Sequence, residues 1–238
     1  MGGRRRGRLH RGRGAAVKAG AAGETAVDHL VAAAATLAQG VAWCEATLGV
    51  TPGPGGQHAL MGTHNRLFKI GSAAFPETYF EIIAIDPDAP APGRARWFGL
   101  DEPALQACIA QQPRLVHMVA RCSALQAQRQ ALVDAGCLPG EVVAAGRDTP
   151  QGRLQWLITV RDDGRLEHGG ALPTLIEWQG VHPTAAMPAS GVTLRALTLR
   201  GLPDAAWSAL RLRGVDHLPL PGAALRATLA TPLGEVTL

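Results

Sequence analysis

Two stretches of the chain have the same pattern, and this repeat limits the fold more than any other feature. Residues 27–37 and 115–125 each contain an apolar run with a histidine near its start, His29 in the first and His117 in the second. Each run is followed by a segment with helical apolar spacing that stops at a glycine. We expect a duplicated strand–helix unit and a pseudo-symmetric cleft with a metal at its centre.

Both units continue with further strands. The first unit reads as βαβββ or βαββ, with a strand at 27–34, a helix at 38–48 and strands at 63–70 and 78–85. The second has a strand near 115–121, a helix near 123–135 and strands near 153–161 and 171–178. A third, partial copy after His182 has a strand, a helix and two strands, but no histidine at the matching position.

The proposed domain limits follow from these elements. They are a basic Arg/Gly tail at 1–24, a βαβββ module at 25–90, a linker with a short helix at 91–112, a second βαβββ module at 113–185 and a C-terminal βαββ extension at 186–238. The tail has too little apolar surface to fold, so we expect it to be disordered.

The positive net charge does not indicate nucleic acid as a partner. Of the 23 Lys and Arg residues, seven lie in the first 23 residues, which contain no acid, so 16 basic and 19 acidic groups remain. No apolar run approaches the roughly 20 residues of a membrane span. The four cysteines lack metal-site spacing and suit reduced thiols. We therefore expect a soluble, cytoplasmic protein that does not bind a membrane.

Five segments together resemble the vicinal oxygen chelate superfamily, and within it the glyoxalase-like domain group. The resemblance covers about residues 27–185, and the segments that carry it are 28–31, 43–50, 62–67, 79–84 and 175–178. It implies an α+β fold in which two tandem βαβββ modules surround a shared cleft. Superfamily members often pair, so a homodimer is possible by analogy.

The resemblance also implies metal ligands on the first and last strands of each module. His29 and His117 match the two first-strand positions, and Glu81 matches the last strand of the first module. Such ligands suit Zn²⁺, Ni²⁺, Mn²⁺ or Fe²⁺. An open coordination position would let two substrate oxygens bind, and a carboxylate could then move the proton next to a carbonyl.

The fourth ligand position departs from this pattern. Alignment of the two last strands places Thr174, a poor ligand, opposite Glu81. Glu177 is the nearest carboxylate and the second candidate catalytic group with Glu81, but it lies three residues further on. Since strand side chains alternate, Glu177 faces the other way unless a bulge intervenes.

Four more residues are candidates for contact with a substrate: His64, Asn65, Trp178 and His182. Each also has a purely structural explanation, as a turn residue for the His64–Asn65 pair or as a core aromatic for Trp178. Similarly, a single histidine such as His29 is more often a buried, hydrogen-bonded side chain than a ligand.

Three functions therefore stay open at this point. The first is a metal-dependent lyase or isomerase that acts on a small oxygen-rich substrate. The second is a non-catalytic protein that sequesters a small molecule in the same cleft, which Thr174 favours. The third is an extradiol-type dioxygenase, whose iron site would need two histidines and one carboxylate.

Overall fold

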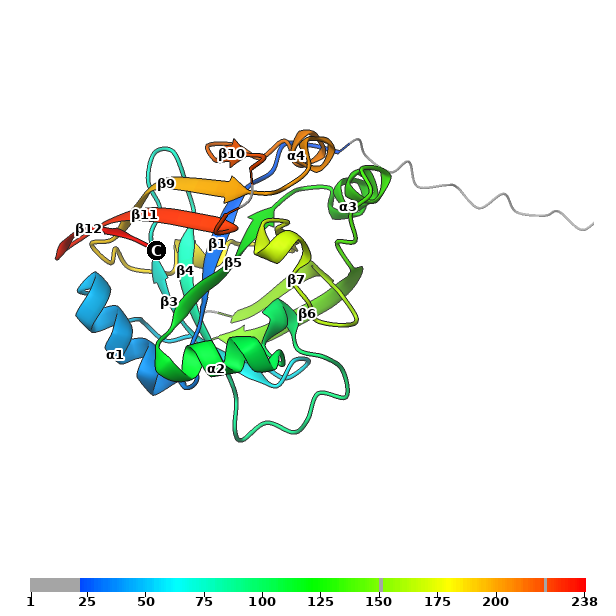
Figure 1. Ribbon diagram of the computed structural model, residues 1–238. Coiled ribbons are helices and arrows are strands. Elements are labelled where there is room, and N and C mark those ends of the chain that lie inside the picture. Colours follow the sequence, from blue (N-terminus) through cyan, green and yellow to red (C-terminus); the bar gives the residue numbers. More distant parts are fainter. Residues whose placement is uncertain (1–21, 150–151, 221) are drawn as a thin grey trace, which may run out of the picture.

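The computed structural model describes residues 22–149, 152–220 and 222–238 (Figure 1). The predicted disorder of the basic tail falls on residues 1–24, which lie outside the described residues except for the last three. In the described part, no helix is long and apolar enough to cross a membrane.

Two modules with the same order of elements form the centre of the molecule (Figure 1). The first consists of β1 (Ala26–Ala33), α1 (Leu37–Leu48), β2 (Gln57–His58), β3 (Thr63–Lys69) and β4 (Tyr79–Ile85). The second consists of β5 (Arg114–Arg121), α3 (Leu125–Asp134), β6 (Glu141–Thr149), β7 (Gly152–Val160) and β8 (Thr174–Trp178).

Short helical elements and a C-terminal part connect or extend these modules. The linker contains a 3-10 turn, η1 (Trp97–Gly99), and α2 (Pro103–Gln111), whereas η2 (Glu167–Gly170) and η3 (Pro183–Ala185) flank β8. The C-terminal part consists of β9 (Thr193–Arg200), α4 (Asp204–Leu210), β10 (Asp216–Leu218), β11 (Leu225–Thr231) and β12 (Gly234–Thr237).

One eight-stranded sheet joins the two modules, in the order β2-β3-β4-β1-β5-β8-β7-β6. In each module the first strand is parallel to the last, β1 to β4 and β5 to β8, and the antiparallel pair β1–β5 joins the halves. The C-terminal strands form a separate sheet, β10-β9-β11-β12. The predicted α+β fold of two tandem βαβββ modules and a C-terminal extension is therefore confirmed.

The two central strands carry matching bulges. His29 pairs with Val119 and His117 pairs with Val31, but Asp28 and Val116 have no partner in the register. Each unpaired residue comes directly before the histidine of its strand. A bulge of this kind changes the direction of a side chain, so the residue before each histidine need not face away from it.

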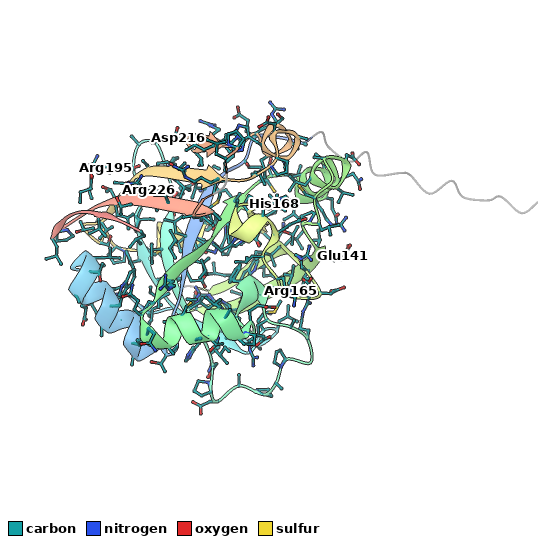
Figure 2. All side chains as sticks on the ribbon, in the orientation of Figure 1. Glu141, Arg165, His168, Arg195, Asp216 and Arg226 are labelled. Carbon is teal, nitrogen blue, oxygen red and sulfur yellow. The ribbon has the colours of Figure 1, made fainter. Side chains whose placement is uncertain are left out.

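The eight-stranded sheet is buried on both faces. One face, which we call the cleft face, carries Val31, Ile83, Val119, Ile158 and Ile176, and the linker residues Trp97 and Phe98 pack against it. The other face packs against α1, α3, α4 and the C-terminal sheet. Many ionisable side chains, such as the six labelled in Figure 2, are solvent-exposed. Charges on the cleft face are therefore exceptional.

Helix α1 shows how closely the helices pack on the sheet. The side chain of Thr36 accepts a hydrogen bond from the Gln39 N–H at the start of α1, and Gly49 ends it in the left-handed conformation. In the first turn of α1, a Cβ atom on Gly40 would lie 2.3 Å from Ile82 Cγ2 on β4. Gly40 therefore permits the close approach of α1 to the sheet.

The first prediction concerns this contact. Gly40→Ala should destabilise the protein by about 1–3 kcal/mol through overpacking, although alanine is normally the better helix former. Urea denaturation measures the change. In the matched control, Ala42→Gly on the exposed side of α1, only the propensity cost of about 1 kcal/mol is expected. A higher denaturation midpoint for Gly40→Ala would contradict the packing argument.

Candidate functional site

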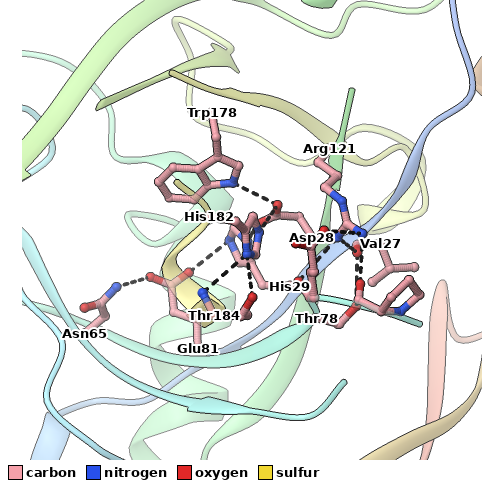
Figure 3. Close-up of polar contacts among 12 residues, drawn as sticks. Val27, Asp28, His29, Asn65, Thr78, Glu81, Arg121, Trp178, His182 and Thr184 are labelled. Atoms are coloured by element: carbon pink, nitrogen blue, oxygen red, sulfur yellow. Dashed lines mark hydrogen bonds and ion pairs between the residues drawn. The ribbon is translucent and has the colours of Figure 1, made fainter. Parts of the chain in front are cut away.

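Three buried ionisable side chains meet on the cleft face, and we call Asp28, His29 and Glu81 the acid–base cluster (Figure 3). His29 Nδ1 lies 2.6 Å from Asp28 Oδ1, and His29 Nε2 lies 3.4 Å from Glu81 Oε2. The first distance is a short hydrogen bond, whereas the second is longer than a good one. The imidazole therefore bridges two carboxylates and is bound more tightly to Asp28.

The strands explain why these groups meet. Glu81 on β4 is the register partner of Val31 on β1, two residues after His29, so it projects to the same face as His29. Asp28 would normally point to the other face, but it is the bulged residue of β1. The bulge thus brings two consecutive residues, Asp28 and His29, into contact.

Further polar side chains extend the cluster toward β3 and β2. Asn65 on β3 donates from Nδ2 to Glu81 Oε1 at 2.6 Å, and the same nitrogen lies 3.3 Å from His58 Nε2. Because an amide nitrogen only donates, His58 accepts at Nε2 and its Nδ1–H faces Thr63 Oγ1 at 3.0 Å. His58 is thus a neutral end of this series of hydrogen-bonded side chains.

At its other end, the cluster reaches β8 and the segment after it. Asp28 Oδ2 accepts hydrogen bonds from Trp178 Nε1 at 2.9 Å and from His182 Nε2 at 3.0 Å (Figure 3). The Thr184 N–H points at His182 Nδ1, so the proton of a neutral His182 lies on Nε2, toward Asp28. Together with His29, these two donors satisfy both oxygens of a fully buried carboxylate.

The cluster keeps its charges despite burial. Burial alone would lower the pKa of His29, but hydrogen bonds with Asp28 and Glu81 outweigh it and raise this pKa to about 9. Burial would raise the pKa of both Asp28 and Glu81. Hydrogen bonds from His182 and His29 nevertheless hold the pKa of Asp28 below its usual value, and the bond from His29 does the same for Glu81. At neutral pH the cluster contains an imidazolium between two carboxylates.

His117 has the opposite surroundings. Its Nδ1 lies 3.2 Å from the Gly170 carbonyl oxygen, and its Nε2 accepts a hydrogen bond from the Thr174 N–H at 3.0 Å. Burial lowers the pKa of His117 to about 3, so the ring is neutral. Phe98 of the linker packs beside it, with ring centroids 5.3 Å apart. His117 is a buried histidine with both nitrogens occupied.

The register shows why the two histidines differ. Glu81 is the partner of Val31, and Thr174 is the partner of Val119, which holds the matching position in the second module. Thr174 therefore takes the place that a carboxylate has in the first module. Its backbone and its hydroxyl, 3.0 Å from His117 Nε2, bind the histidine as neutral groups.

The predicted three-ligand metal site does not fit this geometry. His29 and Glu81 come together, but the predicted third ligand, His117, directs its acceptor nitrogen at Thr174. Within residues 22–149, 152–220 and 222–238, no group of three or more His, Cys, Asp and Glu side chains is arranged to hold a metal ion. The two-histidine, one-carboxylate arrangement of an extradiol dioxygenase lacks its second histidine for the same reason.

Two other predicted residues do not join the cluster. The Glu177 carboxylate accepts a hydrogen bond from the Leu125 N–H at the start of α3, on the face away from the cleft, and so caps a helix. His64 precedes Asn65 on β3, so strand alternation places it on the opposite face, 3.8 Å from Asp86. Asn65, Trp178 and His182 do join the cluster.

Two residues of the site, Asp28 and Trp97, were not predicted from the sequence. Asp28 directly precedes His29, and a pattern with period two assigns it to the wrong face unless the bulge is known. Trp97 belongs to the predicted linker, yet it packs against His58 with ring centroids 5.0 Å apart. An acid inside an otherwise apolar strand was the available signal for Asp28, because such a group needs partners when buried.

A cavity of about 740 Å³ lies beside the cluster. Its walls come from the loop at 50–55, the β3 residues Leu67 and Phe68, the adjacent parts of β6 and β7, and the segment 179–190. His182 lines the cavity and also binds Asp28, while Leu67 is the register partner of Glu81. His29 and Glu81 are each only 4% exposed and are not among the lining residues. Among these hydrogen-bonded side chains, His182 is therefore the one that faces the cavity.

The sequence profile of the glyoxalase-like domain family matches residues 27–212, which include both modules and the whole cluster. The chain belongs to this family. The predicted membership of the vicinal oxygen chelate superfamily is therefore confirmed. No curated protein matches the chain.

Solved structures share the fold at low sequence identity. A hypothetical protein from Staphylococcus aureus is 15% identical, with a TM-score of 0.50 over 74% of this chain and 69% of its own. Methylmalonyl-CoA epimerase in complex with methylmalonyl-CoA and NH4+ is 16% identical, with a TM-score of 0.43 over 70% and 100%. A variant of the Streptomyces coelicolor methylmalonyl-CoA epimerase in complex with 2-nitronate-propionyl-CoA is 17% identical, with a TM-score of 0.40 over 66% and 96%. Because only the first of these matches reaches a TM-score of 0.50, it alone bears on the fold.

The second prediction concerns the charge of the histidines. Nitrogen-detected NMR titration should find His29 protonated at pH 7 and losing its proton near pH 9, whereas His117 stays neutral down to about pH 3. Glu81→Gln should lower the pKa of His29 because one of its two anionic partners is removed. An unchanged His29 pKa in Glu81→Gln would contradict the bridging arrangement.

The same shift has a consequence for stability. Because the pKa of His29 is higher in the folded protein than the ordinary value of 6.5, its contribution to stability is complete below pH 6.5 and is lost as the pH rises through about 9. The free energy of unfolding should fall over this range in the wild type, and His29→Gln should remove that fall.

Proposed function

We propose that this protein is an enzyme of the lyase or isomerase type that moves a proton at a carbon next to a carbonyl in a small oxygen-rich substrate. One observation carries the proposal: a protonated imidazole lies beside a buried, ionised carboxylate, His29 Nε2 being 3.4 Å from Glu81 Oε2. An acid and a base held side by side in a buried site are the two groups that enolisation needs.

Each group has a defined part in the proposed step. Glu81 accepts the proton from the carbon, and His29 donates its Nε2 proton to the carbonyl oxygen, which gives a neutral enol, a neutral imidazole and a protonated Glu81. Glu81 then returns a proton to the carbon, and the enol returns its proton to His29, which restores both groups. The long Nε2–Oε2 separation leaves the His29 proton free to shift to a substrate oxygen.

Asp28 acts through His29. Its short bond to Nδ1 fixes the ring and stabilises the charged imidazole, as a buried carboxylate does for the histidine of a catalytic triad. Trp178 and His182 in turn fix the Asp28 carboxylate. We assign Asp28, Trp178 and His182 as positioning residues, and Asn65 as the group that orients Glu81.

The third prediction tests proton transfer directly. In deuterium oxide, the wild-type protein should catalyse exchange of the proton next to the carbonyl of 2-oxobutyrate or dihydroxyacetone, followed by proton NMR. Glu81→Gln should reduce this exchange by at least about 100-fold, because it removes the base. Glu177→Gln is the matched control, since Glu177 lies on the other face of the sheet, and it should exchange like wild type.

A second function, sequestration of a small molecule, has its own support in the burial of the acid–base cluster and in the large cavity beside it. In that case a probe would raise the melting temperature without exchange. Exchange that is equal in wild type, Glu81→Gln and His29→Gln would contradict the catalytic proposal and favour sequestration.

The fourth prediction concerns the divalent metal, Zn²⁺, Ni²⁺, Mn²⁺ or Fe²⁺, that the family resemblance implied. With two converging ligands, we expect less than one equivalent of metal in the purified protein and no loss of proton exchange on treatment with a chelator. Elemental analysis measures this. One full equivalent that disappears in both His29→Ala and His117→Ala would show that His117 turns into the cleft and would contradict the expectation.

Two earlier expectations stay predictions. They are a cytoplasmic location and a homodimer, and sedimentation analysis of the purified protein tests the second.

A further inference from the structure

Arg147, near the end of β6, places a half-buried positive charge in the wall of the cavity. Among the residues that the structure describes, no hydrogen bond or ion pair joins its guanidinium to another group. The second arginine of this wall, Arg153, is different, because its Nη1 lies 3.0 Å from Asp148 Oδ1. An unpaired charge in a partly buried position is costly unless a ligand pairs with it.

The fold holds Arg147 at a defined place. A Cβ atom on Gly56 would lie 2.4 Å from Arg147 Nη1 and 3.0 Å from its Cδ, so the side chain lies directly on the backbone of Gly56. Gly56 precedes β2, one edge of the sheet, whereas Arg147 belongs to β6, the other edge. The arginine therefore crosses from the second module to the first, beside the polar chain that leads from His58 to Glu81.

We infer that the cavity binds a small monocarboxylate with an apolar body, and that Arg147 pairs with its carboxylate. The planar fork of a guanidinium fits a carboxylate with two parallel hydrogen bonds. Much of the remaining wall is apolar, from Val50, Pro54, Leu67, Leu154, Val181 and Met187. This inference rests on the proposed function, because it names the substrate class of the same cavity.

The surroundings favour a carboxylate over a phosphate. Binding of a phosphate dianion generally needs several donors, such as free backbone N–H groups or a second cation. Near Arg147 the N–H groups of Gly53 and Gly56 already donate to the Leu67 carbonyl and to Asn65 Oδ1. The other arginine of the wall is paired with Asp148. One free guanidinium matches one negative charge.

Arg147 also balances the acid–base cluster. Asp28 and Glu81 carry two negative charges and His29 one positive charge, so the cluster is net negative and repels an anion. Arg147, which lies against Gly56, gives an anionic substrate one attractive group. Its carboxylate would then lie at Arg147 and its carbonyl would point toward His182 and the cluster.

Calorimetric titration with 3-phenylpropionate, a monocarboxylate with an apolar body, tests the inference. Wild type should bind it, whereas Arg147→Gln should weaken binding about tenfold or more, because a charge-assisted bidentate pair is lost. Arg147→Lys should give an intermediate loss. Gly56→Ala should weaken binding as well, because the new methyl group displaces the guanidinium. Arg153→Gln is the matched control and should bind like wild type.

Four results would overturn the inference. The first two are equal affinity of wild type for 3-phenylpropionate and its amide, and equal affinity of wild type and Arg147→Gln. The others are no binding by wild type of any straight-chain or phenyl-substituted monocarboxylate, and tighter binding of phenyl phosphate than of 3-phenylpropionate. Glu81→Gln separates the two proposals, because it should keep carboxylate binding while it loses proton exchange. Binding without exchange in wild type would refute the proposed function alone.

Discussion

The antiparallel pair of β1 and β5 is the interaction on which the rest of the structure depends. Its register relates the two modules by an approximate two-fold axis, with His29 opposite Val119 and His117 opposite Val31. Matching bulges before each histidine preserve this symmetry. Because β4 and β8 then add in parallel to β1 and β5, the same axis also fixes the residues that lie nearest each histidine, Glu81 in one module and Thr174 in the other.

This symmetry of the backbone makes the chemical asymmetry easy to interpret. Two histidines at equivalent positions differ in pKa by several units, since His29 lies between carboxylates and His117 receives only neutral groups. The bulged residues also differ in charge, since the first module has the carboxylate Asp28 and the second has the apolar Val116. The first module therefore holds the charges, whereas the second provides Trp178, and Phe98 of the linker fills the space near His117.

The fold was largely predictable from the sequence, because apolar periodicity and stop residues report local structure that packing then preserves. The matching of Thr174 with Glu81 was also predictable, since it needs only the order of residues in two similar strands. The bonds of Asp28 and His117 were not. Both depend on the direction of the side chain. For Asp28 this direction is set by the bulge in β1, where Asp28 has no register partner. For His117 it is set by the linker and by Thr174.

Arg147 adds to this difference in charge between the two modules, at the edge of the sheet. The eight strands curve until Arg147 on β6 touches Gly56 beside β2, so the two outermost parts of the sheet meet at the cavity. The second module has Thr174 where the first has the Glu81 carboxylate, and it contributes the cation Arg147, which lies against Gly56 of the first module. A cleft with the acid–base cluster from the first module and the unpaired cation Arg147 from the second is electrostatically asymmetric, which favours one orientation of a bound anion. Such a cleft can discriminate between the two ends of a substrate, which the symmetric arrangement of four metal ligands could not do by charge alone.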